Sequence, residues 1–183
     1  MKLPERQSAN YESPPTGNHL AVCYGVFALG TQETKWGEKF QVRIQWELPH
    51  EHMSDGRPHV IGKTYTYSSN EKSSFVQDLE SWRGKKFTDE EFGNFEVFDV
   101  IGVGCFLNLV ESGDYVNIDA IAPLPKGTEH PKFKSERIAF DFDNPNFDEL
   151  RKLTDYWREK VEAAPEFDAV ERQAVHAESE PRF

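Results

Sequence analysis

A chain of 183 residues with 37% hydrophobic and 13% aromatic side chains can fill one core, and a second full domain would be cramped. Its apolar runs, such as residues 21–29, are far shorter than the roughly 20 residues that a transmembrane helix needs, and no signal peptide opens the chain. We therefore expect one soluble domain with tails, located in the cytoplasm.

The net charge of −11 is spread unevenly along the chain. Residues 1–137 carry 15 basic and 20 acidic side chains (net −5), whereas residues 138–183 carry 6 and 12 (net −6). Contact with phosphate requires Lys and Arg, so the total charge argues against a nucleic-acid partner. Because the excess acid is concentrated near the end of the chain, its distribution matters more than its sum.

The first half of the chain predicts an arm and two strands. Residues 1–18 are polar and rich in proline, which indicates a flexible or loosely docked arm. Residues 20–29 predict a long strand with a bulge or bend at Gly25, and a polar loop follows at 31–38. Residues 40–48 alternate apolar and polar side chains, so we expect a second strand with one face in the core and the other in water.

A third strand and a helix come next. Residues 60–68 predict the strand. Ser69 or Asn70 is expected to cap a helix that runs to Trp82 and ends at Gly84. A short second helix is expected at 89–92. The apolar stripe of the helix is expected to consist of Phe75, Leu79 and Trp82. One face of the third strand is expected to carry Ile61, Lys63, Tyr65 and Tyr67.

Residues 103–110 and 115–124 predict a closing hairpin. Five strands with a helix between the third and fourth have the order of an OB fold, so the fold class is mainly β (α+β) with a five-stranded OB-type barrel at 19–137. Residues 138–165 are expected to form a linker and a C-terminal helix at 147–161, capped by Asn144 or Asn146. The charged residues 166–183 predict an acidic disordered tail.

Three stretches carry a resemblance to a known family: FALGTQ at 27–32, TYSSNEKSSFVQDLESWRGKKFTDEEF at 66–92, and YVNIDAIAPLPKG at 115–127. They resemble a bacteriophage-encoded family of OB-fold single-stranded DNA-binding-like proteins. The likeness covers roughly residues 14–127. It implies sequence-nonspecific binding of single strands in phage DNA replication or recombination, in the cytoplasm of the host cell.

Binding of single strands needs cations for phosphates and aromatic faces for bases, which OB folds usually present on strands two and three and on the adjoining loops. If the apolar residues of 40–48 fill the barrel, Arg43 points outward. The expected nucleic-acid-binding residues are Lys35, Trp36, Lys39, Arg43, Lys63, Tyr65, Tyr67, Arg83, Lys85 and Lys86.

Each of these residues also has a purely structural interpretation. Tyr65 and Tyr67 can close the barrel, and Trp36 can pack under a loop. The basic cluster at 83–86 can be a solvated helix end favoured by the helix dipole. The acidic tail can aid solubility, dock a phage or host replication protein, or compete with nucleic acid for the basic groove.

No pattern points to catalysis, a metal or a cofactor. The chain has no GxSxG, Walker or Rossmann glycine motif, and His50, His52 and His59 lack zinc-type spacing. We therefore expect a protein that is not an enzyme. The alternative function is an OB-fold protein-interaction module that docks a replication or host protein without binding nucleic acid, and an open strand edge could pair two copies as a homodimer.

The two cysteines, Cys23 and Cys105, both lie in apolar strand-like runs. A thiol in such a place behaves as a small buried hydrophobe. We expect both to be reduced core residues, with a disulfide between them as the alternative.

Overall fold

The computed structural model describes residues 12–179, with side chains placed as far as Arg172. In that part of the chain six strands form one sheet of order β3-β2-β1-β4-β5, and β6 pairs with β1 off this path. Strands β1 to β5 pair antiparallel, whereas β6 runs parallel to β1. The strands are β1 (Gly17–Thr34), β2 (Gly37–His52), β3 (Pro58–Thr66), β4 (Gly104–Ser112), β5 (Tyr115–Ala122) and β6 (Ile138–Phe140).

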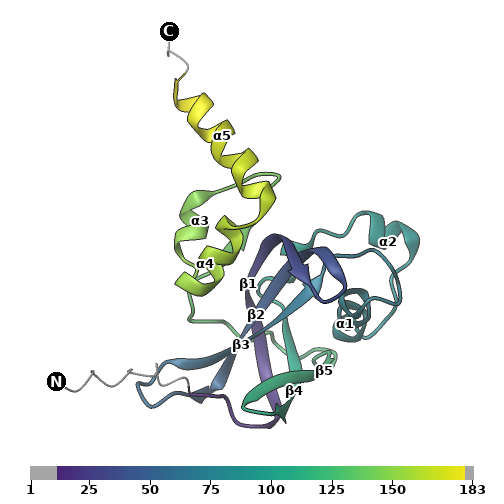
Figure 1. Ribbon diagram of the computed structural model, residues 1–183. Helices are drawn as coiled ribbons and strands as arrows, with labels where there is room; N and C mark the ends of the chain where they lie inside the picture. The colour runs from purple at the N-terminus through teal and green to yellow at the C-terminus, as the bar shows by residue number, and fades with distance from the viewer. Residues whose placement is uncertain (1–11, 180–183) are drawn as a thin grey trace, which may run out of the picture.

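The fold is mainly β in the α+β class, as predicted, and the predicted strand order is present. The sheet is not a closed barrel, because no ladder joins β3 to β5 within residues 12–179. Helix α1 (Ser74–Arg83) instead packs against both of these strands. Figure 1 shows α1 and α2 (Asp89–Gly93) on one side of the sheet and α3, α4 and α5 on the other.

The β1–β2 hairpin is longer than the sequence predicted. Both strands continue through the expected polar loop at 31–38, so that only Lys35 and Trp36 lie between them. The Thr34 hydroxyl accepts a hydrogen bond from the Trp36 amide (3.2 Å) and donates one to the Gly37 carbonyl (2.6 Å). The end of this hairpin extends beyond the core, so its strand residues are polar and resemble a loop in sequence.

Helix α1 starts three to four residues later than predicted. Its N-cap is Ser73, whose hydroxyl accepts a hydrogen bond from the Val76 amide (3.2 Å). Gly84 ends the helix in the left-handed conformation (φ 74°), as expected. The predicted stripe of Phe75, Leu79 and Trp82 is buried, and the Trp82 indole donates a hydrogen bond to the Gly104 carbonyl (3.1 Å).

Two apolar clusters lie on opposite faces of β1. The first is enclosed by the curved sheet and α1, and contains Ile44, Trp46, Trp82 and both free cysteines, as expected for core thiols. Burial raises the pKa of the Cys23 thiol to about 12. The second cluster lies on the outer face of β1, and its members are Tyr24, Phe27, Leu29, Ile138, Phe140, Leu150, Leu153 and Val161.

The second cluster is closed by the C-terminal cover, which we define as β6, α3 (Phe147–Arg151), α4 (Asp155–Glu162) and α5 (Pro165–Ser179). The structure differs here from the predicted linker, single helix and disordered tail. The expected helix at 147–161 is two helices, since a new one begins after Thr154, and α5 occupies most of the expected tail. Residues 180–183 lie outside the described residues.

Buried or partly buried carboxylates attach the C-terminal part of the chain to the sheet. Glu47 on β2 accepts hydrogen bonds from the amides of Lys134 and Ser135 (2.6 to 3.0 Å). Glu166 on α5 accepts bonds from the amide and hydroxyl of Thr31 (2.9 and 2.5 Å). Burial alone would raise the pKa of Glu166, but the bonds from Thr31 hold it below its usual value. These contacts make the C-terminal cover part of the folded domain.

At the other end of the chain, residues 1–11 of the predicted arm lie outside the described residues. Glu12 is docked, because its carboxylate accepts hydrogen bonds from the amide (2.8 Å) and hydroxyl of Ser54 between β2 and β3. No helix in the span from 12 to 179 has the length and apolar character to cross a bilayer.

Candidate nucleic-acid interface

Trp36 and Lys35 form the tip of the β1–β2 hairpin. The Trp36 side chain is 76% exposed, and the Lys35 ammonium lies 5.1 Å from the centre of its indole ring. Lys39 follows on β2 and is also exposed. The tip therefore presents a large aromatic face with Lys35 beside it, while Lys39 lies farther along β2, beyond the opposed pair Glu33 and Glu38. An exposed ring with a cation beside it is the combination that stacks a base and contacts its phosphate.

The register of β2 and β3 divides the remaining predicted residues between two faces. Arg43 lies opposite Thr64, whereas Ile44 lies opposite Lys63 and Val42 opposite Tyr65. Residues directly opposite each other in a ladder share a face. Lys63 and Tyr65 therefore lie on the core side with Ile44, and Arg43 lies on the outer side. The predicted set is not one surface.

On the outer face, Arg43 is covered by α4. Its guanidinium carbon lies 3.9 Å from the centre of the Trp157 ring, and its Nη1 donates a hydrogen bond to the Thr64 hydroxyl (3.0 Å). A Cβ added at Gly62 would lie 2.6 Å from Arg43, so this glycine makes room for the guanidinium. Arg43 thus joins the C-terminal cover to the sheet, which corrects the prediction that it faces solvent.

On the core side, Asp78 of α1 binds both Lys63 and Tyr65. The Lys63 ammonium lies 2.6 Å from the Asp78 carboxylate, and the Tyr65 hydroxyl donates a hydrogen bond to the same oxygen (2.8 Å). Tyr65 is 2% exposed, and burial followed by the charge of Asp78 raises its pKa. A base has no access to this ring, so the structure supports the core interpretation of Tyr65.

Tyr67 lies just after β3 and is 54% exposed. Its ring is 6.0 Å from that of Phe40 and 5.5 Å from that of Phe75. Two adjoining pockets of about 300 and 220 Å³ share Tyr67 and Val97 and form what we call the aromatic groove. The lining of the second pocket includes four carboxylates, those of Glu96, Asp141, Asp143 and Glu166. These negative charges disfavour phosphate along the groove. The exposed part of the Tyr67 side chain lies at the edge of the groove.

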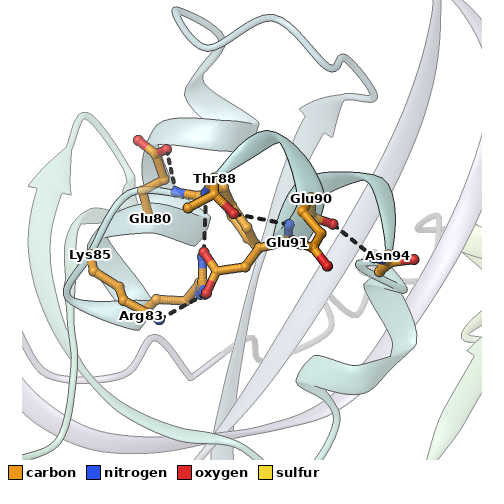
Figure 2. A network of polar contacts seen from close by, with 8 residues as sticks. Glu80, Arg83, Lys85, Thr88, Glu90, Glu91 and Asn94 are labelled. Atoms are coloured by element: carbon orange, nitrogen blue, oxygen red, sulfur yellow. Dashed lines mark hydrogen bonds and ion pairs between the residues drawn. The ribbon is translucent and has the colours of Figure 1, made fainter.

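One carboxylate pairs with two of the three cations in the basic cluster at 83–86 (Figure 2). Glu91 of α2 pairs with both Arg83 and Lys85, each at 2.9 Å. The Arg83 guanidinium also stacks 4.0 Å above the Phe87 ring. Lys86 is exposed and makes no ion pair with a described residue. Arg83 is therefore engaged in the fold, whereas Lys85 and Lys86 still face solvent.

The same network gives the distinctive WRGKKFTDEE string a structural role. Thr88 and Glu91 form a capping box at the start of α2, and Glu80 of α1 accepts a hydrogen bond from the Phe87 amide (3.0 Å), as Figure 2 shows. The string therefore joins two helices through charge pairs and caps. Its caps and charge pairs account for the packing of α2 against α1.

Glu91 should titrate far below an ordinary glutamate. Bonds from Lys85, Thr88 and Arg83 lower its pKa to about 2. Because the folded pKa lies below the unfolded one, the stabilisation is complete above about pH 4.5 and is lost as the pH falls toward 2. We expect side-chain carboxyl NMR to place the Glu91 midpoint near 2, and Glu91→Gln to reduce the loss of stability between pH 5 and 3. A midpoint near 4.5 would contradict the network, and Glu90→Gln is the exposed control.

The sequence analysis missed Trp157 as the partner of Arg43. The available signal was the apolar stripe in residues 147–161, which needs a surface to pack against.

Among residues 12–179, no group of three or more His, Cys, Asp or Glu side chains is placed to hold a metal ion. The chain matches no protein-family model, curated protein or solved structure in the three comparisons.

Proposed function

We propose that this chain is an OB-type protein that binds single-stranded DNA without sequence preference and acts in phage DNA replication or recombination. The strand order with α1 between the third and fourth strands supports the OB-type assignment. The observation that carries the proposal is the hairpin tip, where Trp36 is 76% exposed between Lys35 and Lys39. A tryptophan so exposed buries little of its apolar area in the folded chain, which favours a role in stacking.

The test is a fluorescence-anisotropy titration of a labelled 30-nucleotide single strand and of its duplex, at low and moderate salt. We expect the single strand to bind preferentially. If Lys35 and Lys39 each neutralise one phosphate, the logarithm of the association constant should fall by about 1.4 per tenfold rise in salt. Equal binding of single strand and duplex, or binding that salt leaves unchanged, would contradict the proposal.

The aromatic groove favours a second candidate function, docking of a basic segment of another replication or host protein. Phe40, Tyr67 and Phe98 line its second pocket together with the four carboxylates. A partner with Arg or Lys beside an apolar side chain would complement both features. This candidate predicts that neither single strand nor duplex binds, even at low salt.

A further inference from the structure

A pocket of about 550 Å³ lies on the outer face of the sheet, where three parts of the chain meet. One wall is the start of β3 and the turn before it, and another is the corner between α3 and α4. The third belongs to the strap, which we define as residues 123–137 between β5 and β6. Its lining includes Tyr24, Gln45, Val60, Lys134, Lys152 and Trp157.

The apolar part of the pocket contains two aromatic side chains held in fixed positions. Trp157 is positioned by Arg43, stacked at 3.9 Å, and by the edge of Phe27, with ring centres 6.2 Å apart. Tyr24 donates its hydroxyl hydrogen bond to the Oε1 atom of Gln45. The Gln45 amide nitrogen takes no part in this bond, so it is available to donate to a ligand.

The lining carries three cations against one carboxylate, in a protein whose net charge is −11. Lys152 is already paired with Glu149 (2.6 Å), and Arg57 with Asp55 (2.7 Å). Lys134 is exposed and forms no ion pair with any residue of the described part of the chain. Once these two pairs are counted, the lining presents one cation without an ion pair in the described part of the chain, Lys134, and one carboxylate, Glu136, so Lys134 is the group available for an anion.

The strap wall is held in place without using the Lys134 side chain. Glu47 is 1% exposed, and its carboxylate accepts the amides of Lys134 and Ser135. The pocket is therefore formed before any ligand arrives, which reduces the entropy that binding must overcome. A change at the Lys134 side chain leaves this attachment intact.

We propose that this pocket binds a nucleoside monophosphate, either free or as the phosphorylated end of a DNA strand. The planar base packs against the aromatic and aliphatic lining, the Gln45 amide bonds to its edge, and Lys134 binds the phosphate. The volume is within the range of small-ligand pockets, about 300 to 1,000 Å³. A plain aliphatic acid would use Lys134 but would leave the Gln45 amide without a partner.

The pocket is separate from the hairpin tip but lies on the same strand. Gln45 is nine positions after Trp36, which at about 3.3 Å per residue is roughly 30 Å along β2. If the ligand is the phosphorylated end of a DNA strand, the proposal rests on the proposed function. If the ligand is a free nucleotide, the proposal does not depend on that function.

The experiment is isothermal titration of the full chain with deoxythymidine monophosphate and with thymidine. Parallel titrations use a 12-nucleotide strand with and without a 5′-phosphate. The variants are Lys134→Ala, which removes the proposed phosphate contact, and Lys132→Ala, an exposed lysine of the same strap that does not line the pocket. Val60→Trp, at an exposed lining residue, fills the pocket sterically.

We expect the monophosphate to bind more tightly than thymidine. Lys134→Ala should weaken it about tenfold and Lys132→Ala should leave it unchanged. A strand-end site appears instead as tighter binding of the 5′-phosphorylated strand that is lost in Lys134→Ala. The proposal is overturned if the monophosphate binds no more tightly than thymidine and the 5′-phosphate does not strengthen binding of the strand. It is also overturned if neither Lys134→Ala nor Val60→Trp weakens binding. Either result leaves the proposed function intact if Trp36→Ala still weakens binding of the 30-nucleotide strand.

Discussion

Replacing Trp36 with alanine is expected to weaken binding of a 30-nucleotide single strand by about tenfold to a hundredfold. Stacking of one base on an aromatic side chain contributes about 1 to 3 kcal/mol, and Trp36 offers the most exposed ring at the hairpin tip. Because the side chain packs on no core residue, thermal unfolding should be unchanged. Anisotropy titration at low salt, with circular dichroism as the check on folding, measures both effects.

Tyr156 provides the matched control for this variant. It is 60% exposed on α4, and the Lys160 ammonium lies 5.6 Å from its ring centre, so it repeats the aromatic and lysine pair of the hairpin at a different place. Tyr156→Ala should leave strand binding unchanged. Equal losses in the two variants would show that exposed aromatic rings contribute nonspecifically, and no loss in either would remove the hairpin from the binding site.

Replacing Phe140 with alanine is expected to destabilise the whole domain by about 3 to 5 kcal/mol. Phe140 on β6 is buried in the second cluster, where its ring lies 5.3 Å from that of Phe142. If residues 138–165 were only a linker, the same change would cost little. Urea unfolding followed by tryptophan fluorescence distinguishes these outcomes.

Phe106 is the control for size and chemistry in this experiment. It lies on β4 and is 37% exposed, so the space left by its truncation opens to solvent. Phe106→Ala should change the free energy of unfolding by less than about 1 kcal/mol. A loss for Phe140→Ala no larger than that of the control would mean that the C-terminal cover contributes nothing to the stability of the sheet.

Alternation in residues 40–48 predicted the inner face of β2 correctly, because Val42, Ile44 and Trp46 are all buried. The same alternation could not show what covers the outer face. Glu47 and Arg43 are polar, as solvent-facing residues would be, yet Glu47 binds strap amides and Arg43 stacks on Trp157. Side-chain polarity indicates that a group needs a polar partner, and water is only one such partner.

The candidate site was less predictable than the fold because it depends on pairing between strands. Alternation shows which residues of one strand share a face, but it does not fix which face of the neighbouring strand joins them. Lys63 and Tyr65 therefore could not be assigned to the core side before the register with Ile44 and Val42 was known. The hairpin tip could be predicted without knowing the register, since Lys35, Trp36 and Lys39 lie within five consecutive residues.

The attachment of the strap through Glu47 affects how this protein can diverge. The carboxylate binds main-chain amides of Lys134 and Ser135, which every residue except proline provides. Substitutions at Lys134 and Ser135 should therefore leave this attachment intact as long as Glu47 is kept, whereas His130 and Phe133 use their side chains to join the strap to β4 and to the second cluster. Sequence drift at Lys134 and Ser135 is compatible with the architecture, and selection for the attachment should fall on the buried acid of the second strand.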